Sequence, residues 1–227
     1  MFPIRDDAPH ATTPFTTYFL IALNTLVFVF ELTLGRRALS EFFEQFGFVP
    51  YHVDAWLAGR VPAAAAVMPL FTSMFLHGSP LHLIFNMWGL AIFGDNVEDR
   101  LGHFGYLLFY LACGLVAGLT QFVFNLHSHV PTLGASGAIA GVMGAYFLLF
   151  PTARVLTWFI FFVFWLPAWL VLGYWFVVQF LSGAATAITF QQQSGGVAVW
   201  AHVGGFLTGI LLIKLLPLRK TSYSLES

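Results

Sequence analysis

Residues 134–150 read GASGAIAGVMGAYFLLF, and Pro131 and Pro151 bound this stretch on its two sides. It contains no charged side chain, which is typical of a helix inside a membrane. At 1.5 Å per residue its length is about 26 Å, near the shortest that crosses about 30 Å of hydrocarbon. We therefore expect a short membrane helix that begins below the surface, with Ser136 in its first turn.

The apolar character extends in both directions from this stretch, because Arg154 is the only charged residue between Leu101 and Ile213. Of the 227 residues, 59% are hydrophobic and 8% are charged, against roughly 25% charged in ordinary domains. The mean hydropathy is +0.82. So little polar surface cannot coat a water-soluble globule of this size, and we predict a membrane protein. The net charge of −1 gives no reason to expect nucleic acid.

Hydropathy predicts an all-α membrane protein in which six transmembrane helices form one domain. The expected spans are residues 16–34, 81–97, 104–125, 134–150, 168–182 and 197–216. Residues 1–15 are then a short N-terminal segment, 16–216 the helical domain and 217–227 a tail. The apolar stretch 155–166 ends at Pro167, so we expect it to be re-entrant or interfacial.

Basic residues predict the orientation of these spans. With a cytoplasmic N-terminus, six basic residues lie inside: Arg5, Arg100, Arg154, Lys214, Arg219 and Lys220. Three lie outside: Arg36, Arg37 and Arg60. This excess favours both termini in the cytoplasm. The segment 35–76 then lies on the outer side, where its aromatic and charged residues indicate an amphipathic interfacial loop.

The start of the second span combines a helix cap with two polar side chains. Ser79 suits an N-cap and Pro80 a first helical position. His82 and Asn86 follow at i and i+4, about 40° apart on one face of the helix. His77 precedes the helix and could fold over that face. Alternatively, these side chains only bond to a neighbouring helix.

Ser136 and His202 lie on separate apolar segments and could form a nucleophile and its base. In the first turn of a helix, unpaired amides and the helix dipole would meet negative charge developing at the serine. Small residues near both positions allow close helix contact: Gly137, Gly141, Gly144, Gly205 and Gly209. For each residue alone, a packing serine or a structural histidine is the simpler interpretation. Matching membrane depths on three spans favour catalysis.

Together these motifs resemble the rhomboid family of intramembrane serine proteases, over residues 69–216. The matching stretches are FLHG at 75–78 with His82 and Asn86, FGDNVED at 93–99, GASG at 134–137, and AH at 201–202 with Gly205 and Gly209. The resemblance implies a six-transmembrane-helix rhomboid-like bundle and a serine-type endopeptidase that cleaves in or near transmembrane segments of membrane proteins.

By that resemblance Ser136 is the nucleophile and His202 its general base. The Ser136 amide, Asn86 and His82 would form the oxyanion hole. His77 looks like a polar residue near the site's water, and Phe85 like a gate facing the fifth span. The resemblance implies no cofactor and no metal. The expected partners are transmembrane substrates and the lipid bilayer, without nucleic acid, and the expected location is a prokaryotic inner membrane.

Two positions depart from the family's pattern. The first outer loop reads AVMP at 66–69, where many members carry a Trp-Arg pair. Ala140 stands four residues after the expected nucleophile, where some members place a tyrosine against the catalytic histidine. Neither change removes a catalytic group, but the sequence does not identify what holds the ring of His202.

Three other function classes compete with this interpretation. A zinc protease would need converging ligands, but no HExxH motif occurs, and His77 and His82 would diverge by about 140° even on one helix. A transporter or channel usually shows inverted repeats or paired broken helices, and none is evident. A rhomboid-like pseudoprotease would bind membrane clients without cleaving them. Hydrolysis of a membrane-anchored test substrate separates that class from a protease.

Overall fold

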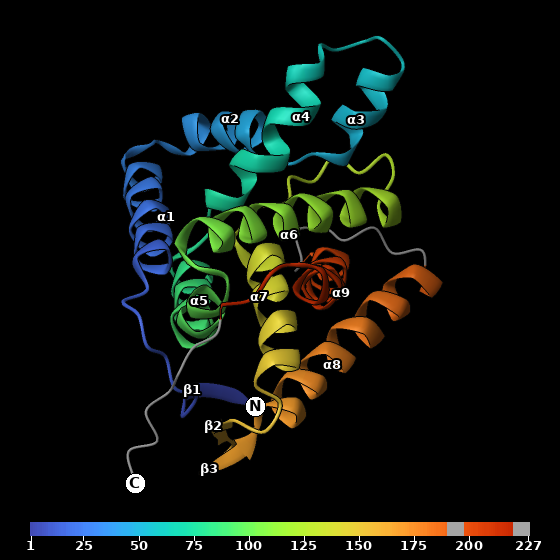
Figure 1. Ribbon diagram of the computed structural model, residues 1–227. Coiled ribbons are helices and arrows are strands. Elements are labelled where there is room, and N and C mark those ends of the chain that lie inside the picture. The colour runs from blue at the N-terminus through green and yellow to red at the C-terminus, as the bar shows by residue number, and fades with distance from the viewer. Residues whose placement is uncertain (190–197, 220–227) are drawn as a thin grey trace, which may run out of the picture.

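The computed structural model of the chain describes residues 1–189 and 198–219 (Figure 1). The helices of this part are α1 (Phe15–Thr33), α2 (Arg36–Phe46), α3 (Pro50–Leu57), α4 (Ala63–Thr72), α5 (Pro80–Leu101), α6 (His103–Phe124), α7 (Ser136–Leu149), α8 (Ala168–Thr189) and α9 (Val199–Leu215), with a 3₁₀ turn η1 (Ser73–Phe75). The strands are β1 (Phe2–Asp6), β2 (Arg154–Phe159) and β3 (Phe162–Pro167).

A helix forms in each of the six segments that hydropathy selects. By length and composition, three of these helices qualify as membrane spans: Phe15–Thr33, His103–Phe124 and Ala168–Ala185. The helices α7 and α9 are apolar but shorter. The chain is therefore a helical membrane protein.

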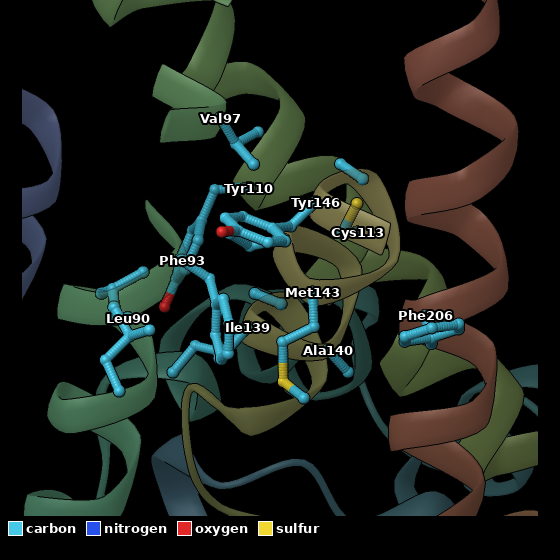
Figure 2. Packing of buried hydrophobic residues seen from close by; sticks show 14 of the residues in the cluster. Leu90, Phe93, Val97, Tyr110, Cys113, Ile139, Ala140, Met143, Tyr146 and Phe206 are labelled. Atoms are coloured by element: carbon cyan, nitrogen blue, oxygen red, sulfur yellow. The ribbon is translucent and has the colours of Figure 1, made fainter. Parts of the chain in front are cut away.

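Helix α7 runs through the centre of the molecule, between α5 on one side and α9 on the other (Figure 1). Every residue from Gly137 to Tyr146 is buried. Figure 2 shows Ile139, Met143 and Tyr146 of this helix within the main hydrophobic cluster. Because small residues dominate the first half of α7, neighbouring helices can surround it closely.

The contact between α7 and α9 is made largely by backbone. A Cβ atom added at Gly205 would collide with the carbonyl oxygen of Gly137, and one added at Gly209 with that of Gly141. Such close approach is typical of small residues in membrane helices. It brings the N-terminal turns of the two helices, which carry Ser136 and His202, to the same level.

The apolar stretch 155–166 is a β-hairpin rather than a re-entrant segment. Strands β2 and β3 pair antiparallel, with Phe159 opposite Phe162 at the turn. Aromatic and β-branched residues make up most of both strands, and such residues favour strands. At the turn, Phe161 is 88% exposed. Pro167 ends β3, and α8 follows at once.

The N-terminal segment is part of the fold. Strand β1 pairs antiparallel with β2 and completes a sheet of order β1-β2-β3. Beyond the strand, the side-chain amide of Asn96 donates to the carbonyls of Ala8 and Pro9, at 3.1 and 3.2 Å. Thr12 donates to the carboxylate of Asp99 through its amide and its hydroxyl. The FGDNVED stretch on α5 therefore anchors the N-terminal segment.

The segment between α1 and α5, expected to be an amphipathic interfacial loop, contains the helices α2, α3 and α4. Helix α2 exposes Arg37 and Glu41, which form an ion pair of 3.0 Å, while Phe42 packs against Phe30 of α1. Phe48 forms an isolated bridge with Thr132 in the loop before α7. The segment thus covers the end of the bundle at which Ser136 lies, which agrees with a structural role.

Candidate active site

The chain enters α7 through a glycine that no other residue can replace without strain. Gly134 has φ of +114°, a backbone conformation that residues other than glycine rarely adopt. A Cβ atom at this position would lie 2.6 Å from Nε2 of His82 and 3.3 Å from Nδ2 of Asn86. The two polar side chains of α5 therefore lie directly against the backbone that leads to Ser136.

The start of α5 has the predicted cap. The side chain of Ser79 accepts a hydrogen bond of 3.2 Å from the backbone N–H of His82, and Pro80 is the first helical residue. This cap fixes where α5 begins and so places His82 and Asn86 in the first two turns of the helix. Both residues face the cavity that contains Ser136.

Ser136 and His202 are in direct contact. Oγ of Ser136 lies 2.7 Å from Nε2 of His202. The first turn of α9 is held by two neighbours on α6: Trp200 stacks on Phe124 at 3.8 Å and 8°, and the amide of Ala201 donates to Oε1 of Gln121 at 3.3 Å. A serine hydroxyl at this distance from an imidazole can lose its proton to the ring.

The second nitrogen of His202 contacts a residue that sequence reasoning missed. Nδ1 lies 3.0 Å from Oε1 of Gln179 on α8. Trp175, one turn earlier on α8, places its ring centroid 5.7 Å from that of His202 at an angle of 36°. A signal was available, because an amide side chain within an apolar span usually has a specific partner.

A cavity of about 430 Å³ connects these groups. Ser136, His202, His82, Asn86 and Phe85 all line it. Further polar lining comes from Gln121, Asn125, Ser128 and Thr132. Nδ2 of Asn86 is buried and has no hydrogen-bond partner among the residues described. An unpaired buried donor is costly, so one that faces a cavity is well placed to bind an acceptor.

His77 lies behind His82 rather than in the cavity wall. The two rings are 5.1 Å apart, and the backbone N–H of His77 donates to the buried carboxylate of Glu31. Burial, reinforced by the neighbouring charge of His82, lowers the pKa of His77 to about 4, so its ring is neutral at physiological pH. Both ring nitrogens lack a partner in the part of the chain that the structure covers.

Phe85 lines the cavity and is exposed on its other side. Its ring meets Phe2 of β1, with centroids 5.6 Å apart. Trp88, one turn further along α5, donates from its indole nitrogen to the carbonyl of Pro3 at 2.9 Å. The N-terminal strand thus contacts the helix that carries Phe85.

Comparison with known proteins agrees with this architecture. The family model of the Rhomboid domain matches residues 64–219. The presenilin-associated rhomboid-like protein A of Danio rerio, a mitochondrial protein, is 30% identical over 86% of this chain and 46% of its own length. The mitochondrial rhomboid protein 1 of Saccharomyces cerevisiae is 33% identical over 61% of this chain and 39% of its own. The rhomboid protease GluP of Bacillus subtilis is 35% identical over 58% and 24%.

The chain spans less than half the length of each of these three relatives. Two of the three have names that place them in mitochondria, so the expected prokaryotic location finds no support in this comparison. The match to the Rhomboid family model covers α5 to α9 and all the residues that line the cavity. By this match the chain belongs to the rhomboid family.

Proposed function

We propose that the protein is an intramembrane serine endopeptidase that cleaves peptide bonds in or near transmembrane segments of its substrates. The observation that carries the proposal is the 2.7 Å contact between Oγ of Ser136 and Nε2 of His202 in a cavity lined in part by polar side chains. The names of rhomboid relatives, one of them a protease, support it.

In this mechanism His202 acts as general base and then as general acid. Nε2 takes the proton of the Ser136 hydroxyl while Oγ attacks the carbonyl carbon of the scissile bond. The tetrahedral intermediate then collapses, the imidazolium returns the proton to the leaving amine, and an acyl-enzyme remains. A water molecule, deprotonated in the same way, attacks the ester and releases the second product.

The oxyanion of the intermediate needs donors that are already in place. We assign this role to the backbone N–H of Ser136, the side-chain amide of Asn86 and the ring of His82. The support is that Asn86 and His82 both lie against Gly134, two residues before Ser136, and that Nδ2 of Asn86 has no other partner within the described residues.

We further propose that α1, α5, α6, α7, α8 and α9 cross the membrane, with both termini on the cytoplasmic side. Helix α7 has 14 residues and so reaches about 21 Å, less than the hydrocarbon thickness. Ser136 at its N-terminus would then lie below the surface, in reach of water only through the cavity. A substrate helix must unwind to expose an amide there, which favours segments with small residues at the cleaved bond.

The test is hydrolysis of a membrane-anchored reporter by the purified full chain. Ser136→Ala should abolish cleavage and labelling by a fluorophosphonate probe, with an unchanged melting temperature, because one oxygen is lost at a site lined by small residues. The matched control is Ser182→Ala on α8, whose hydroxyl donates within its own helix, to the carbonyl of Val178. Cleavage by Ser136→Ala at the wild-type rate would contradict the assignment of Ser136 as the nucleophile.

A pseudoprotease that binds membrane clients is the alternative function. It predicts that wild type captures the reporter without cleaving it and leaves the fluorophosphonate unreacted. The direct contact between serine and imidazole favours the protease, because a binding protein has no need to align a hydroxyl with a base.

A further inference from the structure

The two nitrogens of His202 must carry out different tasks if this residue is the base of the proposed reaction. Nε2 can take the serine proton only when its lone pair is free, and the neutral ring then carries its hydrogen on Nδ1. Something must hold the ring in this tautomer and orientation. With Ala140 on the α7 side, no aromatic ring is supplied from that helix at this position.

The group next to Nδ1 is an acceptor. Oε1 of Gln179 lies 3.0 Å from Nδ1, and an amide oxygen accepts hydrogen bonds but cannot donate them. The contact therefore requires the hydrogen on Nδ1 and leaves Nε2 facing Oγ of Ser136. Trp175, four residues earlier on the same face of α8, contacts the same ring.

We propose that Gln179 is a positioning residue of the active site: its side-chain oxygen holds His202 in the tautomer and orientation that proton transfer from Ser136 requires, with Trp175 limiting rotation of the ring. This inference rests on the proposed protease function. Ser136, His202 and Gln179 then form a chain of three groups from three helices, α7, α9 and α8.

An amide suits this place better than a carboxylate. The carboxylate that orients histidine in many serine hydrolases would have to be buried here in an apolar span, where an ionised group is costly. The glutamine oxygen supplies the acceptor without a net charge. In surroundings of low dielectric constant its hydrogen bond is also stronger than it would be in water.

The experiment compares two replacements at position 179 in the full-length protein. Gln179→Leu keeps most of the volume and removes the acceptor. Gln179→Glu keeps an acceptor oxygen at the same distance from the backbone. For each variant kcat and KM are measured with the reporter, together with the rate of fluorophosphonate labelling at Ser136 and the melting temperature. Ser182→Ala, a polar-to-apolar change one turn further along α8, is the control.

We expect Gln179→Leu to lower kcat and the labelling rate by roughly tenfold to a hundredfold, less than loss of the carboxylate in a Ser-His-Asp triad, with KM nearly unchanged. Gln179→Glu should recover most of the loss in kcat because it restores the acceptor oxygen, but at a lower melting temperature because a carboxylate is costly in an apolar span. Ser182→Ala should behave as wild type. If Gln179→Leu does not fold, Gln179→Met, which is unbranched and also lacks the amide oxygen, should show the same kinetic loss.

Three results would overturn the proposal. The first is a kcat of the folded Leu or Met variant within twofold of wild type. The second is an equal loss in the Leu and Glu variants, which would show that position 179 matters for packing alone. The third is absence of both cleavage and labelling in wild type. This result would contradict the proposed protease function, and His202 would then not be a general base that Gln179 could position. The first two leave the protease assignment intact.

Discussion

Asn86 is the residue at which a packing role and a catalytic role differ most clearly. It is 7% exposed, it lies against Gly134, and its Nδ2 has no partner among the described residues. A buried amide used only for packing would normally have its donor satisfied, because an unpaired buried donor costs about 1–3 kcal/mol. Nδ2 of Asn86 is therefore free to donate a hydrogen bond to an acceptor atom bound in the cavity.

Asn86→Ala should therefore lower kcat by roughly 10²–10³ with little change in KM, because the lost interaction forms mainly in the transition state. Neighbouring His82 can compensate in part, so the lower end of this range is expected. The melting temperature should hardly change, since no existing hydrogen bond from Nδ2 is removed.

Both quantities are measured on one detergent-solubilised preparation. The control is Asn24→Ala, a buried amide on α1 that donates to the carbonyl of Leu20 within its own helix at 2.7 Å. A normal kcat of Asn86→Ala together with a lower melting temperature would show that Asn86 serves in packing and not in catalysis.

The residues of the site differ in how far the sequence could predict them. Ser136, His202, His82 and Asn86 could be grouped because each lies in a recognisable motif at a similar depth. The amide of Gln179 in an apolar span signals a specific partner, but the sequence does not say which, because the relation of Gln179 and Trp175 to His202 depends on the rotation of α8 about its axis. That rotation is set by tertiary packing against α9, which hydropathy does not encode.

At the scale of elements, the first turn of α1 is capped by a side chain from α5. The carboxylate of Glu98 accepts hydrogen bonds of 2.8 Å from the backbone amides of Thr16 and Thr17 and from the Thr17 hydroxyl. Pro14, the residue at the N-cap position itself, supplies no side-chain bond. His103 also contacts this carboxylate, so one buried group joins α1, α5 and the start of α6.

Glu98→Ala should lower the free energy of unfolding by on the order of 3 kcal/mol, since it uncaps a helix and leaves buried donors unpaired. Glu98→Gln, which keeps one acceptor oxygen, should lose less. Thermal unfolding in detergent measures the effect, and hydrogen exchange at Thr16 and Thr17 should localise it.

The control for this change is Glu41→Ala, which removes the exposed ion pair with Arg37 and should shift stability by no more than about 0.5 kcal/mol. Equal melting temperatures for the Glu98 and Glu41 variants would contradict the capping role of Glu98.

A helix formed in each of the six apolar segments expected to be helical, whereas the sheet was not predicted, and the reason is physical. An apolar run of 12 residues fits a buried helix segment or a hairpin equally well, and periodicity alone does not separate them. The partner that completes the sheet, β1, lies about 150 residues earlier in the sequence, in the N-terminal segment for which no regular structure was expected.

At the scale of the whole molecule, β1 connects parts of the chain that are otherwise distant. It pairs with β2, its Asp6 accepts a hydrogen bond from Tyr146 on α7, and Asp7 forms an ion pair of 2.7 Å with Arg154. Burial raises the pKa of Asp6 above 3.8, its ordinary value, although the Tyr146 hydroxyl acts in the opposite direction.

This shift predicts how stability depends on pH. A carboxyl whose pKa is raised on folding stabilises the fold below its unfolded pKa, and this contribution is lost as pH rises through the folded value. Asp6→Asn, neutral at every pH, should therefore gain stability relative to wild type as the pH rises from about 4, the ordinary pKa of an aspartate, toward neutrality.

Melting temperatures of both proteins across that range provide the measurement, with Glu41→Gln as a control for removal of an exposed carboxylate. The gain in melting temperature of Asp6→Asn over wild type should grow as the pH rises. A gain that stays constant or shrinks would contradict a raised pKa of Asp6.

The cap that Glu98 supplies to α1 also bears on the order in which the protein can be completed during synthesis. Thr16 and Glu98 are 82 residues apart, and Asp7 and Arg154 are 147 apart. A ribosome adds residues from the N-terminus toward the C-terminus. The first turn of α1 and strand β1 are therefore made before their partners, Glu98 and strand β2. The backbone amides of Thr16 and Thr17 thus reach their final hydrogen-bond partner only after Glu98 has been made, and Asp7 only after Arg154 has been made.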